Sequence, residues 1–245
     1  MRTICIFNHK GGVGKTTTAI NLAAGLSREN KKVLLVDLDP QGNVDTCLKI
    51  KKEHTLYDAM TGKQPVQQCI ANLAENLDIL SSTEEIVKAE HYLAQQENSR
   101  LLLKEMMSGV NGYDFMIFDC PPSLGLMNQN ALAFCKEVFV PVATDYLGFD
   151  ALKKMQGIVT AVNRIYGNNI KITKIIPTMY DRRNKICKET LSIIQNEYPE
   201  RTTYPIHMNS KIKEAPKFGK SIFSYAKSSS GARDYGKLVE DVLAM

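Results

Sequence analysis

Two lysines enclose a cluster of glycines close to the start of the chain, and the residue types in this stretch suit the binding of a phosphate group. The stretch consists of Lys10, Gly11, Gly12, Val13, Gly14, Lys15, Thr16 and Thr17. Glycine tolerates positive φ and has no side chain, so the backbone can wrap closely around an oxyanion. Lys15 can reach the β- and γ-phosphates of a nucleotide, and the Thr16 hydroxyl can bind Mg²⁺. The stretch therefore predicts a nucleotide-binding loop that also holds a magnesium ion.

The segments on both sides of this loop support the prediction. Residues 4–7 form a short apolar run, which predicts a buried strand, and residues 18–26 have apolar residues at helical spacing. Strand, glycine-rich loop and helix is the context that such a loop requires, and the helix N-terminus adds partial positive charge. The common pattern begins with glycine where this chain has His9, and Lys10 is an additional lysine. A chance cluster of glycines and surface lysines is the alternative, which the number of matched positions disfavours.

Two aspartates follow the next apolar run, residues 32–37, which predicts the second strand. Asp37 and Asp39 then lie at the carboxyl end of that strand, where open α/β sheets bind their ligands. Pro40 and Gly42 fix the turn that aims them. The plain alternative, that an aspartate merely caps this turn, remains open for one of the two.

A third aspartate, Asp119, comes near the end of another apolar run, residues 114–120. An acid at the end of such a strand holds Mg²⁺, usually through a water molecule. The predicted metal residues are therefore Thr16 and Asp119, with Asp37 supporting the site indirectly.

The remaining patterns predict the fold. Strands and helices alternate, which predicts an α/β fold with a mostly parallel twisted sheet and helices on both faces. With 245 residues, the chain is long enough for one domain with a sizeable core, predicted as residues 1–245. Further strands are expected at residues 77–80, 137–142 and 170–180. Helices are expected at residues 55–60, 83–107 with a break near 98–99, 151–166, from 182, and after 232.

Composition excludes several classes of protein. Apolar residues make up 44% of the chain, which is typical of a globular protein. No apolar run reaches the length of a transmembrane helix, and the first strand leaves no room for a signal peptide. The six cysteines show no Cys-x-x-Cys spacing, so we expect buried, reduced thiols in a cytosolic protein. An iron–sulfur cluster at Cys120 is the disfavoured alternative, because no second cysteine is suitably spaced.

Positive charge is concentrated in one part of the chain. Residues 164–237 contain 15 Lys and Arg against 6 Asp and Glu, a balance of +9, within a chain whose net charge is +5. Residues 1–163 carry a balance of −2, as do the last eight residues. This distribution indicates a polyanionic partner.

Three motifs together resemble the ParA/MinD family of ATPases. They are the deviant loop with its extra lysine, residues 33–43 with the sequence VLLVDLDPQGN, and residues 115–123 with the sequence FMIFDCPPS. The last motif is similar to the Walker B strand of that family, and the second is similar to the ParA (Soj-like) branch, which partitions plasmids and chromosomes. The resemblance covers essentially the whole chain and implies a P-loop NTPase fold of the deviant Walker A type.

The family resemblance also implies roles for these residues. ATP and Mg²⁺ are the implied cofactors, and a homodimer would form with ATP sandwiched between the subunits. Lys10 would cross to the phosphates of the partner subunit, Asp39 would position the attacking water, and the implied catalytic residues are Lys10, Lys15 and Asp39. The implied adenine-flanking residues are Thr178, Met179 and Pro205.

In the ParA branch, basic residues in two regions bind DNA without reading its sequence. The matching residues are Arg182, Arg183, Lys185, Lys188, Lys211, Lys213 and Lys217. Scattered phosphate contacts of this kind give nonspecific, salt-sensitive binding. The resemblance further implies a ParB-like protein that stimulates hydrolysis, and a cytoplasmic location on the nucleoid. No helix-turn-helix extension is expected before the first strand.

Three alternatives remain within the superfamily. A membrane-associated spatial regulator of the MinD type would use its last helix on lipid, but Glu240 and Asp241 oppose anionic lipid, so we expect this helix to dock on the core. A tyrosine kinase would need a tyrosine-rich tail, and only Tyr225 and Tyr235 lie near the end. A ParA-like protein that positions a cargo other than DNA remains open.

Overall fold

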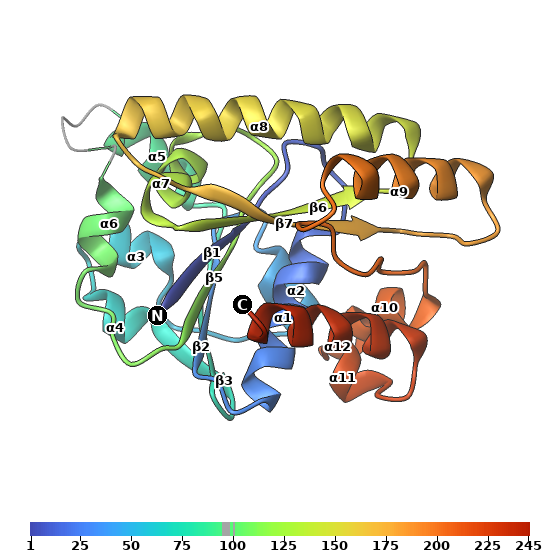
Figure 1. The fold of residues 1–245 in the computed structure, drawn as a ribbon. Coiled ribbons are helices and arrows are strands. Elements are labelled where there is room, and N and C mark those ends of the chain that lie inside the picture. The colour runs from blue at the N-terminus through green and yellow to red at the C-terminus, as the bar shows by residue number, and fades with distance from the viewer. Residues whose placement is uncertain (95–98, 100) are drawn as a thin grey trace.

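A twisted, mostly parallel sheet forms the centre of the molecule (Figure 1). The computed structural model describes residues 1–94, 99 and 101–245. Over these residues the sheet has seven strands in the order β3-β4-β2-β5-β1-β6-β7. Their bounds are β1 Arg2–Ile6, β2 Val33–Asp37, β3 Ile70–Ala74, β4 Leu77–Leu80, β5 Phe115–Asp119, β6 Glu137–Ala143 and β7 Lys171–Thr178. All neighbours are parallel except β3, which is antiparallel to β4.

Helices cover both faces of the sheet, as the alternating pattern predicts (Figure 1). Their bounds are α1 Lys15–Arg28, α2 Asn43–Leu48, α3 Leu56–Met60, α4 Val66–Cys69, α5 Ile86–Leu93, α6 Leu102–Met107, α7 Leu126–Phe134, α8 Tyr146–Tyr166, α9 Lys185–Glu197, α10 Ser210–Glu214, α11 Ile222–Tyr225 and α12 Ser230–Leu243. A 3₁₀ helix, η1, covers Ala215–Phe218. No helix among the described residues is long and apolar enough to cross a membrane.

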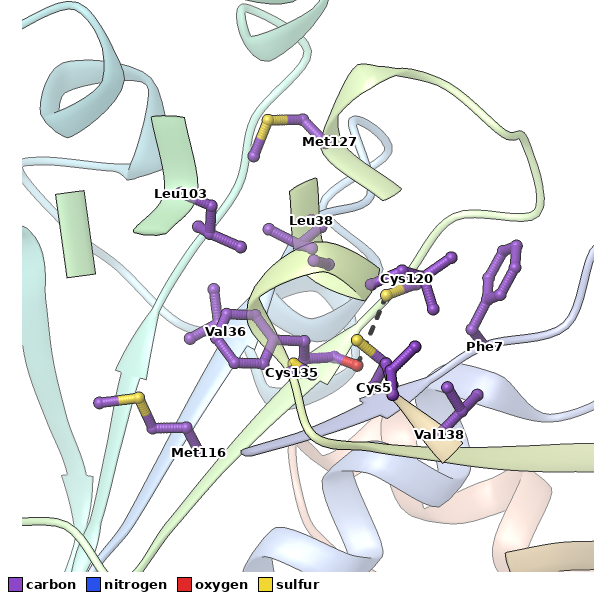
Figure 2. Close-up of a cluster of buried hydrophobic side chains, with 14 of the residues drawn as sticks. Cys5, Phe7, Val36, Leu38, Leu103, Met116, Cys120, Met127, Cys135 and Val138 are labelled. Carbon is purple, nitrogen blue, oxygen red and sulfur yellow. Dashed lines mark hydrogen bonds between the residues drawn. The ribbon is translucent and has the colours of Figure 1, made fainter. Parts of the chain in front are cut away.

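Two hydrophobic clusters lie on the two faces of the sheet because successive side chains of a strand point to opposite sides. In β1, Ile4 and Ile6 belong to the cluster that α1 and α12 cover. Cys5 and the following Phe7 belong to the other cluster, which also contains side chains of α6, α7 and α8 (Figure 2). Because both faces are buried, the central strands read as continuous apolar runs in the sequence.

The carboxyl ends of the central strands meet at one edge of the sheet. Ile6 of β1 and Asp37 of β2 are both paired with Asp119 of β5. The loop after β1 and the two acidic strand ends are therefore neighbours in space although they are far apart in sequence. This adjacency creates the site described below.

The last helix docks on the core, which confirms the expectation for α12. Tyr235, Leu238 and Val242 are buried against α1, and burial of each such side chain contributes roughly 1.5–3 kcal/mol. The approach is close: a Cβ on Gly25 would lie 2.4 Å from a methyl group of Val239. Ion pairs and hydrogen bonds at the end of α12 add to this, with Lys174 Nζ 2.8 Å from Asp241 Oδ2 and Arg2 donating to the Val242 carbonyl.

Several boundaries differ from the sequence predictions. The residues from 182 do not open a helix, because α9 starts at Lys185 and Asn184 caps it by accepting from the Ile186 N–H. Helix α8 begins five residues earlier than expected, at Tyr146. The segment at 44–76, which showed only one short helix in sequence, also contains α2, α4 and β3. Part of the predicted helix break near residue 98 lies outside the described residues.

Candidate nucleotide site

The phosphate loop connects β1 to α1 and is held in an open curve by two glycines in the left-handed region. Gly12 and Gly14 have φ of 71° and 87°, values at which other residues would be strained. No side chain caps the start of α1, so its first N–H groups are available to an anion. The hydroxyl of Thr178 donates to the Val13 carbonyl over 2.9 Å and ties the loop to the end of β7.

Lys15 lies inside the curve of this loop. Its side chain is buried, and its Nζ donates to the Lys10 carbonyl over 3.0 Å. Burial lowers the pKa of Lys15, and the carboxylates of Asp119 and Asp39 oppose that shift. A buried cation with only one hydrogen-bond partner among the described residues is suited to an anionic ligand.

His9 occupies the position where the common loop pattern has glycine. Its Nδ1 is buried and has no hydrogen-bond partner among the described residues. Burial lowers the pKa of His9, and the nearby charges of Lys154 and Lys15 lower it further. The imidazole therefore favours its neutral form and adds no charge to the loop.

Asp119 lies at the end of β5 and is completely enclosed. Both of its carboxylate oxygens are buried and lack a hydrogen-bond partner within the described part of the chain. Burial raises the pKa of Asp119 to about 7, whereas the adjacent Thr16 hydroxyl and Lys15 lower it. An enclosed carboxylate without donors, next to a hydroxyl, fits a hydrated divalent cation, which prefers oxygen ligands. Thr16 and Asp119 are thus the residues that would hold Mg²⁺, and a bound nucleotide would supply further oxygens.

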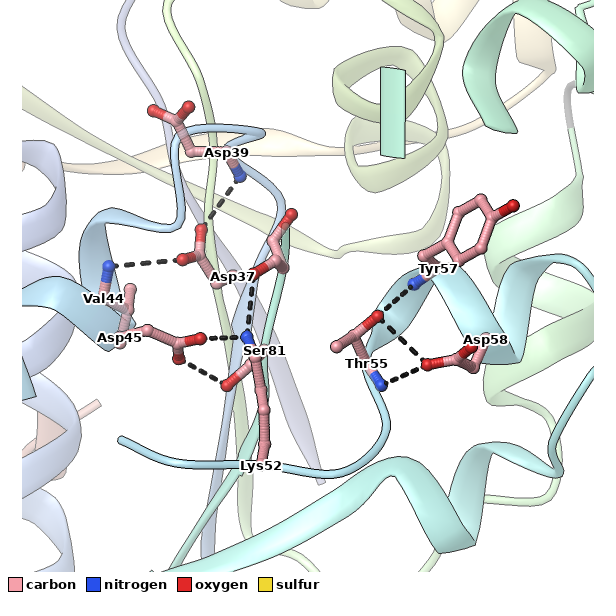
Figure 3. A network of polar contacts seen from close by, with 10 residues as sticks. Asp37, Asp39, Val44, Asp45, Lys52, Thr55, Tyr57, Asp58 and Ser81 are labelled. Carbon is pink, nitrogen blue, oxygen red and sulfur yellow. Dashed lines mark hydrogen bonds and ion pairs between the residues drawn. The ribbon is translucent and has the colours of Figure 1, made fainter. Parts of the chain in front are cut away.

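Asp37 holds the turn that carries Asp39 (Figure 3). Its carboxylate accepts from the N–H of Asp39 over 2.9 Å and from the N–H of Val44 over 3.2 Å. Asp37 is fully buried, and burial together with the nearby Asp119 raises its pKa well above the usual range. Its contacts are those of a residue that positions a turn, in line with its expected indirect role.

Asp39 differs from Asp37 in that its side chain is partly exposed at the edge of the sheet. One oxygen accepts from the Gln41 N–H over 3.0 Å, and the other lies 3.3 Å from the Asn43 side-chain amide. Figure 3 shows the Asp39 carboxylate pointing away from that of Asp37. A carboxylate oriented in this way can accept a proton or a hydrogen bond from a water molecule.

The additional lysine, Lys10, is held by a residue that the sequence reasoning missed. Its Nζ lies 2.9 Å and 3.0 Å from the two carboxylate oxygens of Asp145. Asp145 directly precedes α8, at the carboxyl end of β6. The rule that pointed to Asp37 and Asp119 would have found it, because acids at the ends of parallel strands share one edge.

The predicted adenine-flanking residues lie next to the phosphate loop. The end of β7 runs beside residues 205–208, with the Ile206 N–H donating to the Pro177 carbonyl and the Tyr180 N–H donating to the Ile206 carbonyl. Thr178 therefore lies between the phosphate loop and the Pro205 segment, and its hydroxyl is used to hold the loop. Met179 is exposed and has a positive φ of 54°.

The predicted DNA-binding residues form two exposed groups, and several of them have acidic neighbours. Arg183 bonds to Asp181, Lys185 lies 3.6 Å from Glu189, and Lys211 lies 2.8 Å from Glu214. Contact with Lys211 and with the Tyr225 hydroxyl lowers the pKa of Glu214 to about 2. The remaining members, which have no ion pair within the described residues, are Arg182, Lys188, Lys213 and Lys217.

All six cysteines are free, as expected from their spacing, and five of them are buried. Cys5, Cys120 and Cys135 belong to one hydrophobic cluster beneath the loop (Figure 2). Burial raises the pKa of each of these thiols, which keeps them protonated. They behave as small apolar side chains, because metal binding requires the thiolate.

A glycine-rich loop between the first strand and the first helix of a parallel sheet, with acids on adjacent strand ends, defines a P-loop NTPase. The additional lysine within the loop places it in the deviant Walker A class. Comparison with known proteins agrees. Residues 1–172 match the AAA domain family. The chain is 36% identical over 246 residues to the chromosome-partitioning ATPase Soj of Treponema pallidum (strain Nichols), covering 99% of this chain and 97% of that protein.

A second relative is the chromosome partitioning protein ParA of Myxococcus xanthus (strain DK1622), which is 35% identical over 99% of this chain and 88% of its own length. Among solved structures, cobyrinic acid a,c-diamide synthase of Mycobacterium smegmatis with an ATP analogue and magnesium matches with a TM-score of 0.84. The sequence identity is 26%, over 99% of this chain and 94% of that one. The chain belongs to the ParA/MinD family of ATPases, in its Soj-like partition branch.

Proposed function

We propose that this ATPase binds ATP with Mg²⁺, forms a nucleotide-sandwich dimer, binds DNA without sequence preference and acts in plasmid or chromosome partition. A ParB-like protein would stimulate hydrolysis and release the dimer from the nucleoid. The observation that carries the proposal is the different placement of the two loop lysines. Lys15 is buried in the loop, whereas Lys10 lies at the surface on Asp145.

The position of Lys10 supports a dimer. A lysine held only by an exposed carboxylate can exchange that partner at little cost, because such pairs contribute at most about 1 kcal/mol. The phosphates of a nucleotide bound to a second subunit offer it a stronger counter-charge. In that position Lys10 would offset the charge that develops on the γ-phosphoryl group during transfer.

Exposed apolar side chains beside the same edge also support a dimer. Tyr146 and Leu147, next to Asp145, are 79% and 60% exposed, and Leu124 in the loop after β5 is 45% exposed. Apolar side chains at this density on a charged surface are typical of a face that another protein covers. A second copy facing the nucleotide would cover them.

The proposed hydrolysis assigns a separate task to each residue of the site. Lys15 and the N–H groups of α1 would bind the β- and γ-phosphates, and Thr16 with Asp119 would hold the metal ion. Bound Mg²⁺ would neutralise phosphate charge. Asp39 would orient the attacking water, and Asp37 would keep the Asp39 turn in place through its two backbone hydrogen bonds.

The proposed DNA contacts rest on the seven basic residues at 182–188 and 211–217. A dimer would double this surface, and each lysine or arginine that neutralises a phosphate releases a counterion. The binding would therefore be steeply salt-dependent and favoured by ATP. The membrane alternative finds no support in α12, because its apolar side chains are already buried against α1.

Duplex binding and sedimentation, each measured with ATP, ADP or no nucleotide, test the proposal. We expect a dimer and DNA binding only with ATP, and we expect Lys10→Ala to remain monomeric while still binding ATP. A matched control is Lys32→Ala, which removes an exposed lysine at the opposite edge of the sheet. Equal DNA binding in all three nucleotide states would contradict the proposed switch, and no binding in any state would point to a cargo track other than DNA.

A further inference from the structure

A cavity of about 590 Å³ opens between the two predicted basic regions. The turn at residues 181–183, the segment at residues 204–208 and the first half of α12 line it. The second basic region lies close by, because the Asn209 amide donates to the Ser230 hydroxyl at the start of α12. The cavity is large enough to receive a phosphate group with its adjoining sugar.

Aromatic rings form the inner wall of the cavity, but their faces are already in use. The rings of Tyr180 and His207 meet edge to face with centroids 5.1 Å apart, and Tyr204 is tilted against His207 at 5.8 Å. Lys237 Nζ lies 3.5 Å from the centre of the Tyr204 ring. Because no ring face is open for stacking, this wall is a poor platform for nucleic-acid bases.

The cavity carries more positive charge than its own acids neutralise. Its two aspartates are engaged: Asp181 bonds to Arg183, and the buried Asp234 lies 3.0 Å from His207 Nδ1. The cations left over are Arg182, Arg233 and Lys237, all exposed and without an ion pair in the described part of the chain.

Two of these cations come from α12 and are arranged to act together. Arg233 and Lys237 are four residues apart, so they lie one turn from each other on the same face of the helix. Arg233 uses one nitrogen on the Ser228 carbonyl, which leaves the rest of its guanidinium fork free. Neither residue belongs to the two regions that the sequence singled out.

We propose that this cavity receives a backbone phosphate of duplex DNA, with Arg233 and Lys237 of α12 and Arg182 of the facing turn as its ligands. The inference rests on the DNA binding proposed above and adds a specific pocket to it. The excess of cations selects an anion, and the occupied ring faces favour a phosphate over an unstacked base. Helix α12 thus contributes to DNA binding while its opposite face packs on α1.

The test compares Arg233→Gln, Lys237→Gln and the double variant with the wild-type chain. Affinity for two unrelated duplexes is measured with a non-hydrolysable ATP analogue at several salt concentrations. Each lost phosphate contact lowers the slope of log affinity against log salt by about 0.9, so a dimer of the double variant should lose at least about 2. Its affinity at low salt should fall more than tenfold on both sequences.

A matched control is Lys227→Gln, because Lys227 is exposed just before α12 and does not line the cavity. It should change affinity less than twofold, and thermal melting of every variant checks that it folds. A wild-type slope in the double variant, with binding lost in Lys213→Gln/Lys217→Gln, would overturn the pocket and leave the proposed function standing. Loss of single-stranded but not duplex binding in the double variant would equally overturn it. No duplex binding by the wild-type chain would remove the proposed function itself.

Discussion

The phosphate-loop edge and the basic surface both consist of charged residues, but they hold their charges in opposite ways. At the loop, Lys15, Asp37 and Asp119 are buried, and burial shifts the pKa of all three toward the neutral form. On the basic surface, Arg183 and Lys211 are exposed and share their charge with an acid two or three residues away. Buried charge is expensive and must have a ligand, whereas exposed charge is cheap and acts only in numbers. Single substitutions should therefore have large effects at the loop and small effects on the surface.

The largest effect is expected for Lys15→Ala. Removing the buried cation leaves the β- and γ-phosphates without their charged partner, and we expect ATP affinity to fall by about 100-fold or more. Isothermal titration calorimetry measures this directly, with Lys32→Ala as the control. Affinity within threefold of the wild type would mean that the loop is not a nucleotide site.

Asp39→Ala should separate hydrolysis from binding. Because the Asp39 carboxylate is oriented at the strand end and Asp37 still holds the turn, the variant should bind ATP but hydrolyse it about 100-fold more slowly. The protein should accumulate as the ATP dimer in sedimentation experiments. Normal turnover would move the orientation of water to another residue.

Asp119 should make the nucleotide-free protein less stable as pH rises. The folded chain keeps this proton up to about pH 7, whereas an unfolded aspartate loses it near about pH 4. The folded state therefore binds more protons between these values, so the free energy of unfolding falls as pH increases through this window. Asp37, whose pKa is also raised, acts in the same direction.

Thermal melting between pH 5 and pH 8 tests this linkage. At pH 8, Asp119→Asn should melt roughly 5 °C above the wild type without nucleotide, and its Tm should depend less on pH. Asp150→Asn is the control, because that aspartate is exposed on α8. A wild-type Tm that rises over this range would contradict the burial of charge at the loop.

A smaller effect is expected for Asp145→Asn, which releases Lys10. The pair is partly exposed, with side-chain exposures of 27% and 52%, so its loss should shift the dimerisation constant by about fivefold at most. The direction should be toward the ATP dimer in sedimentation equilibrium, because Lys10 no longer has a partner within its own subunit. Weaker dimerisation would show that Asp145 itself belongs to the interface.

The smallest effect is expected for Lys211→Gln on the basic surface. Its charge is already shared with Glu214, so duplex affinity should fall by about twofold or less. Lys213→Gln, which removes a lysine without an ion pair in the described residues, should cost more at low salt. The reverse order would mean that pairing with Glu214 prepares Lys211 for DNA.

The sequence predicted the elements that local patterns encode. The loop, the central strands and α12 were found because continuous apolar runs and helical spacing reflect burial directly. The strand β3 and the short helices α2 and α4 were not found, because none shows enough periodicity to rise above loop composition. The N-terminus of α9 was placed too early because the arginines at 182 and 183 carry no stop signal, whereas the cap at Asn184 is a three-dimensional contact.

For the site, the sequence alone determined which residue types were available: the two loop lysines, the threonine and the acids at strand ends. Their roles stay predictions that the experiments above address. Only the tertiary structure decided what each of them contacts. Lys10 lies on Asp145, 135 residues away, and His207 lies on Asp234, so neither pair leaves a local signal. Burial also decided which charges are shifted, because a pKa depends on the solvent and charge around a group and not on its neighbours in sequence.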